Sequence, residues 1–190
     1  MTPTPRISKA IAQDHAEIKA IYDRIVSSTS RDEQIRYQNL FVWELARHAV
    51  GEELVVYPAF EKHVQFVGAG LATKDREEHQ AVKEQLKTFQ SLDPSNPTFI
   101  PTLQGLMNDL LSHMREEEGE DMVMLEKTLS EHDSQSLSKA FTRTKIFVPS
   151  RAHPGAPNKP PFETAVGLLT APFDQLADLF RKWPRKGVEV

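Results

Sequence analysis

Four of the seven histidines, together with two glutamates, occur in two copies of one pattern. In each copy a histidine is followed 33 or 34 residues later by a second histidine, which has a glutamate four residues after it. The six residues are His15, His48 and Glu52 in the first copy and His79, His113 and Glu117 in the second. Imidazole nitrogens and carboxylate oxygens are ligands of iron, manganese and zinc, so the chemistry that this pattern indicates is metal binding.

The repeat extends beyond these six residues. Further pairs match at a shift of 64 or 65 residues: Asp14 with Glu78, Lys19 with Lys83, Glu44 with Asp109, and Glu53 with Glu118. Internal similarity on this scale predicts two related helical hairpins that face each other. Ligand-type side chains from both hairpins would then meet in the middle.

The complete set argues for metal more strongly than any member does. One histidine on the apolar face of a helix is usually an ordinary core residue, and a His/Glu pair four residues apart is common on helix surfaces. Four histidines and two glutamates on inward faces, however, would be buried polar groups without partners. A pair of ions bridged by two carboxylates meets that need. Ligands without sulfur favour iron or manganese, with zinc as an alternative.

Apolar residues recur at three- and four-residue intervals over four long stretches, which predicts four helices. These helices span about residues 8–25, 33–63, 74–92 and 98–129. Pro58 is expected to kink the second helix, and Gly68 and Gly70 to form a turn. Short connections predict an all-α fold, an antiparallel up-down-up-down four-helix bundle. In each hairpin the two histidines are at similar distances from the loop, so they lie at the same height.

The character of the chain changes after about residue 130. We therefore divide it into a bundle that carries the metal site (1–130) and an extension (131–190). The extension is expected to contain a short helix near 134–145, a proline-rich stretch and an apolar helix over about 162–183. The apolar stripe of the last helix is too large to leave in water, so we expect this helix to pack on the bundle rather than to meet a partner. The stripe consists of Val166, Leu169, Phe173, Leu176, Leu179, Phe180 and Trp183.

Composition excludes several classes of protein. Cysteine is absent, which excludes disulfides, iron–sulfur clusters and cysteine nucleophiles. A net charge of −4 offers no general footprint for nucleic acid or anionic lipid. No apolar run approaches the roughly 18 residues that a membrane helix needs. We therefore expect a cytoplasmic protein, a monomer or weak homodimer, without nucleic-acid or membrane partners.

The arrangement H…HxxxE…H…HxxxE resembles the hemerythrin-like HHE cation-binding family over about residues 8–130. The resemblance implies a four-helix bundle with a non-haem di-iron centre. In it His15 and His48 would bind one iron, His79 and His113 the other, and Glu52 and Glu117 would bridge them. Oxygen carriers of the wider superfamily have an HxxxH pair on the third helix, whereas here His79 is followed at that spacing by Lys83. The missing imidazole leaves more open coordination positions, which argues against simple reversible oxygen carriage.

Three further residues are candidates for supporting roles. Glu44 and Asp109 each lie four residues before a ligand-type histidine, where a carboxylate would accept the hydrogen of the other ring nitrogen, with a solvent-facing position as the alternative. Tyr22 lies seven residues after His15 and is a candidate donor to a bound oxygen species, with core packing as the alternative.

Two functions follow from this sequence. The first is a di-iron protein that reacts with or senses dioxygen or peroxide, with weak peroxidase- or catalase-like activity as its enzymatic form. The second is an iron sensor or store whose metal-dependent folding is read by a partner protein. The sequence alone does not separate them, nor does it separate either from a purely structural metal site.

Overall fold

The computed structural model describes residues 3–156, 158 and 162–184, without the side chains of 162–169. Every regular element in these ranges is a helix, which confirms the prediction of an all-α chain. The elements are α1 (Ile7–Ser27), α2 (Arg31–Gly51), the π-helix η1 (Glu52–Val56), α3 (Tyr57–His63), α4 (Gly68–Phe89), α5 (Phe99–Glu116), the π-helix η2 (Glu117–Asp121), α6 (Met122–Thr128), α7 (Glu131–Thr144) and α8 (Phe162–Asp178). None of the described helices combines the length and hydropathy needed to cross a membrane.

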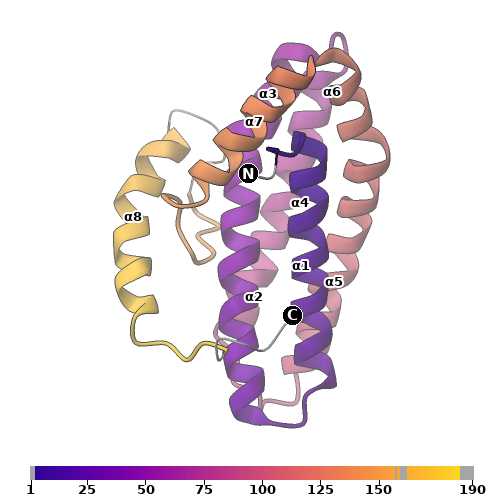
Figure 1. The fold of residues 1–190 in the computed structure, drawn as a ribbon. Helices are drawn as coiled ribbons and strands as arrows, with labels where there is room; N and C mark the ends of the chain where they lie inside the picture. Colours follow the sequence, from indigo (N-terminus) through magenta and orange to yellow (C-terminus); the bar gives the residue numbers. More distant parts are fainter. Residues whose placement is uncertain (1–2, 157, 159–161, 185–190) are drawn as a thin grey trace.

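The long helices lie side by side in a bundle (Figure 1). α1 and α2 are joined by three residues, of which Ser30 caps α2 by accepting a hydrogen bond from the backbone N–H of Glu33. α4 and α5 are joined by residues 90–98, where the Asp93 and Asn96 side chains accept hydrogen bonds from nearby backbone N–H groups. These two helical hairpins are the two copies of the sequence repeat.

The predicted turn at Gly68 and Gly70 is wrong, because α4 begins at Gly68. The chain turns just before it, where Phe66 has a positive φ of 65°. Gly68 is required for a different reason: a Cβ there would lie 2.1 Å from the Phe60 carbonyl oxygen. The glycine therefore allows α3 and α4 to approach each other closely.

The second and fourth predicted helices each contain a π-helical segment in the middle. In η1 the Tyr57 N–H donates to the Glu52 carbonyl, and in η2 the Met122 N–H donates to the Glu117 carbonyl. Each bond spans five residues instead of four, so one extra residue is accommodated without ending the helix. Both segments begin at the glutamate of an HxxxE motif.

Pro58 lies in the first turn of α3, directly after η1. In the structure, a π segment directly precedes the position where the sequence predicts a kink. Proline is not its general cause, because the position that matches Pro58 in the second half is Val123, and η2 forms there all the same. What the two segments share is the metal-type motif, in line with the frequent occurrence of π-helical turns at functional sites.

Two apolar clusters fill the bundle, one at each end. One contains Ile18, Leu45, Leu86 and Leu110 among others, and the other contains Ile11 and Tyr57 among others. His15 lies between Ile11 and Ile18 on α1, so the histidine level separates the two clusters. Polar groups placed there are shielded from water on both sides.

The extension returns to the α2 side of the bundle (Figure 1). Ala152 joins the core, and Arg151 forms a buried ion pair of 2.6 Å with Asp178. The packing predicted for the apolar stripe is nevertheless wrong for four side chains of the last helix and the turn after it. Phe173, Leu176, Leu179 and Phe180 are all more than half exposed. The parts of that prediction that concern Val166 and Leu169 lie outside the described side chains.

Candidate metal centre

The six residues of the repeated pattern come together in the bundle, and all are buried. His15 comes from α1, His48 from α2, Glu52 from η1, His79 from α4, His113 from α5 and Glu117 from η2. The ligand atoms of His15, His48 and Glu52 lie within 4.8 Å of one another, and so do those of Glu52, His79 and His113. Glu52 therefore belongs to both groups.

The histidines form two pairs, each made by one hairpin. The Nε2 atoms of His15 and His48 are 3.1 Å apart. The Nε2 atoms of His79 and His113 are also 3.1 Å apart. Two ligands that bind one ion at about 2.1 Å and at right angles are about 3 Å apart, so each pair has the spacing that one ion requires.

Each glutamate reaches at least one histidine of each pair. Glu52 lies 3.1 Å from Nε2 of His48 and 3.4 Å from Nε2 of His79. Glu117 lies 3.5 Å from Nε2 of His15 and 4.0 Å from Nε2 of His113. None of their four carboxylate oxygens has a hydrogen-bond partner, although all are buried. Buried carboxylates of this kind need a cation.

The outer nitrogens of the four rings face four other carboxylates. His15 Nδ1 is 2.8 Å from Glu118 and His113 Nδ1 is 2.8 Å from Glu78. The remaining two contacts are His48 Nδ1 to Asp14 at 3.3 Å and His79 Nδ1 to Glu53 at 3.4 Å. A carboxylate that accepts the Nδ1 hydrogen leaves a lone pair on Nε2, which is the form that binds metal.

This arrangement corrects the predicted role of Glu44 and Asp109. Asp109 is exposed and accepts a hydrogen bond from Gln85, 2.6 Å away. Glu44 is half-buried, and its burial raises its pKa, but the Nδ1 atom of His48 faces Asp14 instead. The carboxylates that face the Nδ1 atoms of the histidines come from neighbouring helices. They were visible in the sequence as matching acidic pairs of the repeat, Asp14 with Glu78 and Glu53 with Glu118.

The tyrosine at the site is Tyr57 and not Tyr22. Tyr22 is partly buried and packs against an apolar cluster. The Tyr57 hydroxyl is fully buried, 2.9 Å from Nε2 of His79. Burial and the nearby carboxylates raise the Tyr57 pKa well above its ordinary value, so the hydroxyl keeps its hydrogen. The matching residue of the second half is Met122, which makes the centre asymmetric.

The pKa values of the four histidines in the metal-free protein show that the site favours positive charge. With four neutral rings, two Nε2 lone pairs would face each other in each histidine pair. Burial lowers the pKa of His15 and of His79. Against the same burial, Glu52 and Asp14 raise the pKa of His48 to about 9, and Glu78 raises that of His113. In the first pair, the proton held by His48 thus occupies the place where an ion would bind.

We predict that the metal-free protein loses stability between about pH 6.5 and 9. The folded-state pKa of His48 exceeds its ordinary value of 6.5, so the stability from its proton is complete below pH 6.5 and is lost as the pH rises through 9. At about 1.36 kcal/mol per pKa unit this loss is about 3 kcal/mol. The pKa values of His15 and His79 are lowered, so their contributions are already complete at pH 6.5. Urea unfolding with a chelator at both pH values tests this, and equal free energies would contradict it.

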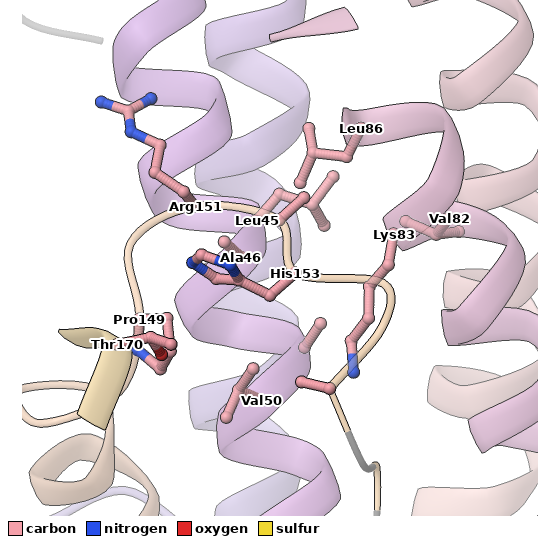
Figure 2. A pocket seen from close by; sticks show the side chains of 13 residues that line it. Leu45, Ala46, Val50, Val82, Lys83, Leu86, Pro149, Arg151, His153 and Thr170 are labelled. Atoms are coloured by element: carbon pink, nitrogen blue, oxygen red, sulfur yellow. The ribbon is translucent and has the colours of Figure 1, made fainter. Parts of the chain in front are cut away.

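A small apolar pocket lies beside the centre, between α2 and α4, and the chain around Arg151 and His153 closes it (Figure 2). Its volume is about 30 Å³, room for about one or two water-sized molecules. Lys83 lines it and donates to Glu53, which in turn faces His79.

Comparison with known proteins agrees with this geometry. The hemerythrin HHE cation-binding domain family matches residues 6–125. A hemerythrin-like protein of Schizosaccharomyces pombe is 53% identical over 179 residues, which cover 94% of this chain and 88% of that protein. A DNA nickase of Nostoc sp. is 23% identical over 145 residues, which cover 76% of this chain but 40% of that protein. No solved structure gives a significant match. The chain therefore belongs to the hemerythrin HHE cation-binding domain family.

Proposed function

We propose that this chain is a cytoplasmic non-haem di-iron protein that reacts with or senses dioxygen or peroxide. Its two iron ions would lie between the hairpins of an antiparallel up-down-up-down bundle. The observation that carries the proposal is the set of four buried Nε2 atoms and four unpartnered carboxylate oxygens in two equivalent halves. We propose iron over manganese or zinc because of the nitrogen and oxygen ligands and the family resemblance.

Each side chain has a distinct role in this proposal. His15 and His48 would hold one ion, His79 and His113 would hold the other, and the carboxylates of Glu52 and Glu117 would serve both ions and offset their mutual repulsion. When bound, the iron pair supplies electrons to dioxygen or peroxide. The outer carboxylates keep each Nδ1 protonated, and the Tyr57 hydroxyl is a hydrogen-bond donor on the His79 side.

Two features favour reaction with a small molecule over reversible oxygen carriage. Lys83 occupies the position of a further histidine and is held by Glu53, so it adds no ligand. The apolar pocket of about 30 Å³ beside Lys83 favours a small molecule. We therefore propose dioxygen or a similarly small oxygen species as the partner, and a monomer or weak homodimer as the working form.

An iron sensor or store is the second candidate, and one observation favours it. Phe173, Leu176, Leu179 and Phe180 are exposed at the end of the extension, a surface that a partner protein could read. In this case metal binding would change the bundle, and the partner would detect that change. Peroxide consumption by the loaded protein distinguishes the two, since a sensor or store needs no turnover.

Metal counting tests the proposal. We expect two iron ions per chain after anaerobic reconstitution, measured by elemental analysis, and an absorption change on exposure to oxygen. His79→Ala with His113→Ala should reduce the count to one or none, whereas the matched substitution His132→Ala, at an exposed histidine on α7, should leave two. A single ion in the parent protein, or two ions in the double variant, would contradict the two-ion centre.

A further inference from the structure

The two halves of the repeat differ sharply at two buried positions next to the centre. Asp75 and Asp121 in the second half match Ile11 and Val56 in the first. Ile11 and Val56 are fully buried, while Asp75 and Asp121 are only 1% and 4% exposed. The second half thus has a buried acidic pair where the first half is closed by apolar side chains.

Asp75 is the more unusual of the two acids. Both of its carboxylate oxygens are buried without a hydrogen-bond partner, and so is one oxygen of Asp121. One Asp75 oxygen, one Glu78 oxygen and a ring nitrogen of His113 lie within 4.8 Å of one another. A buried carboxylate beside two further ligand atoms has the surroundings of a cation site.

This group is continuous with the surface on one side and with the centre on the other. A hollow of about 280 Å³ between α4 and α5 is lined by Glu78, Asp109, His113 and Glu116. On the inner side, His113 presents Nδ1 to Glu78 and Nε2 to His79. Acidic side chains therefore line the hollow. It ends at Glu78 and His113, whose ligand atoms lie near that of Asp75.

We propose that Asp75, Glu78 and His113 form an auxiliary site for a divalent cation, through which iron enters the centre from the hollow between α4 and α5. The proposal rests on the two-ion centre proposed above. The site is a transit site because His113 belongs to both the auxiliary site and the centre. The entering ion binds Nδ1 of His113 and displaces its proton to solvent through the hollow. When the ion has moved to Nε2 in the centre, Nδ1 takes a proton back from solvent and again donates to Glu78. At the matching positions of the first half, Ile11 and Val56 offer no ligand atom.

Lys74 lies beside two of the acidic residues that line the hollow. Its ammonium group pairs with Glu116 and lies 3.5 Å from Glu78, and the side chain is 45% exposed. An entering cation would displace this ammonium group from Glu78. Exposed ion pairs of this kind are weak, so an entering cation displaces the ammonium group easily, and Lys74→Gln should accelerate uptake.

The rate of metal uptake tests the proposal. Chelated full-length protein is mixed anaerobically with Co²⁺, uptake is followed by stopped-flow absorbance, and the final count is measured by elemental analysis. Asp75→Asn should slow uptake at least tenfold and leave the final count at two. Asp75→Glu should restore most of the rate, and Asp23→Asn, which removes the same charge from an exposed position on α1, should match the parent.

Uptake by Asp75→Asn within twofold of the parent, with two ions bound at the end, would overturn the transit site and leave the two-ion centre intact. A parent that never binds two ions would overturn both. Should Asp75→Asn fail to fold, Asp75→Ile, which copies the first half, is the deciding variant: a folded Asp75→Ile protein that loads at the parental rate would also overturn the proposal.

Discussion

Removal of the metal should lower the melting temperature of the protein by about 10–20 °C at neutral pH. Without ions, six buried side chains lose their shared partner, and the free energy of binding is lost from folding. A loss of about 5 kcal/mol corresponds to this shift, because each kcal/mol changes the melting temperature of a chain of this size by about 2–4 °C. Calorimetry with and without a chelator measures it.

Readdition of iron provides the control for this experiment, and it should restore the original midpoint. Because apolar clusters fill the bundle on both sides of the centre, we expect the metal-free protein to remain helical below its melting point. Equal midpoints with and without chelator would place the metal outside the bundle.

Glu52→Gln and Glu117→Gln should have opposite effects on the metal-free protein, although both should weaken metal binding at least about 100-fold by removing a bridge. Against burial, His48 and His79 lower the pKa of Glu52, so its charge stabilises the fold. Burial and the charge of Glu52 raise the pKa of Glu117 well above its ordinary value, so an ionised Glu117 is unfavourable. Glu52→Gln should therefore cost about 3 kcal/mol, whereas Glu117→Gln should be neutral or stabilising.

Urea unfolding in the presence of a chelator measures the stability part of this prediction, and competition with a coloured chelator measures the affinity part. Glu120→Gln, at an exposed position of η2, is the matched control and should change neither. Equal destabilisation by both substitutions would mean that the two glutamates are equivalent in the metal-free site.

The sequence predicted the groups that meet in the centre better than it predicted their surroundings. Spacing along one helix is enough to place His48 and Glu52 on one face, and the repeat then supplies the other half. The outer carboxylates do not follow from spacing along one helix, because Glu44 and Asp109, one turn before the histidines, do not face their Nδ1 atoms. Asp14 reaches His48 from α1 instead, and such a contact depends on how neighbouring helices are rotated.

The π segments also have no signature in hydrophobic periodicity. One extra residue shifts the pattern by about 100° without interrupting it, so each long helix reads as continuous. The sequence feature that accompanies each π segment is a pair of adjacent acids at the end of the HxxxE motif, Glu52–Glu53 and Glu117–Glu118. In a regular helix, neighbours point in different directions, yet Glu52 and Glu53 are both fully buried.

The π segments make this site more sensitive to chain length than to composition. Deleting one residue between Glu52 and Tyr57 would convert η1 into a regular helical turn and shorten the helix without breaking it. Everything after the deletion would rotate by about 100°, which would move Tyr57 away from His79 and Phe60 away from Gly68. Substitutions in η1 outside Glu52 and Glu53 can be absorbed one side chain at a time, whereas loss of a single residue would uncouple the metal centre from the end of the bundle.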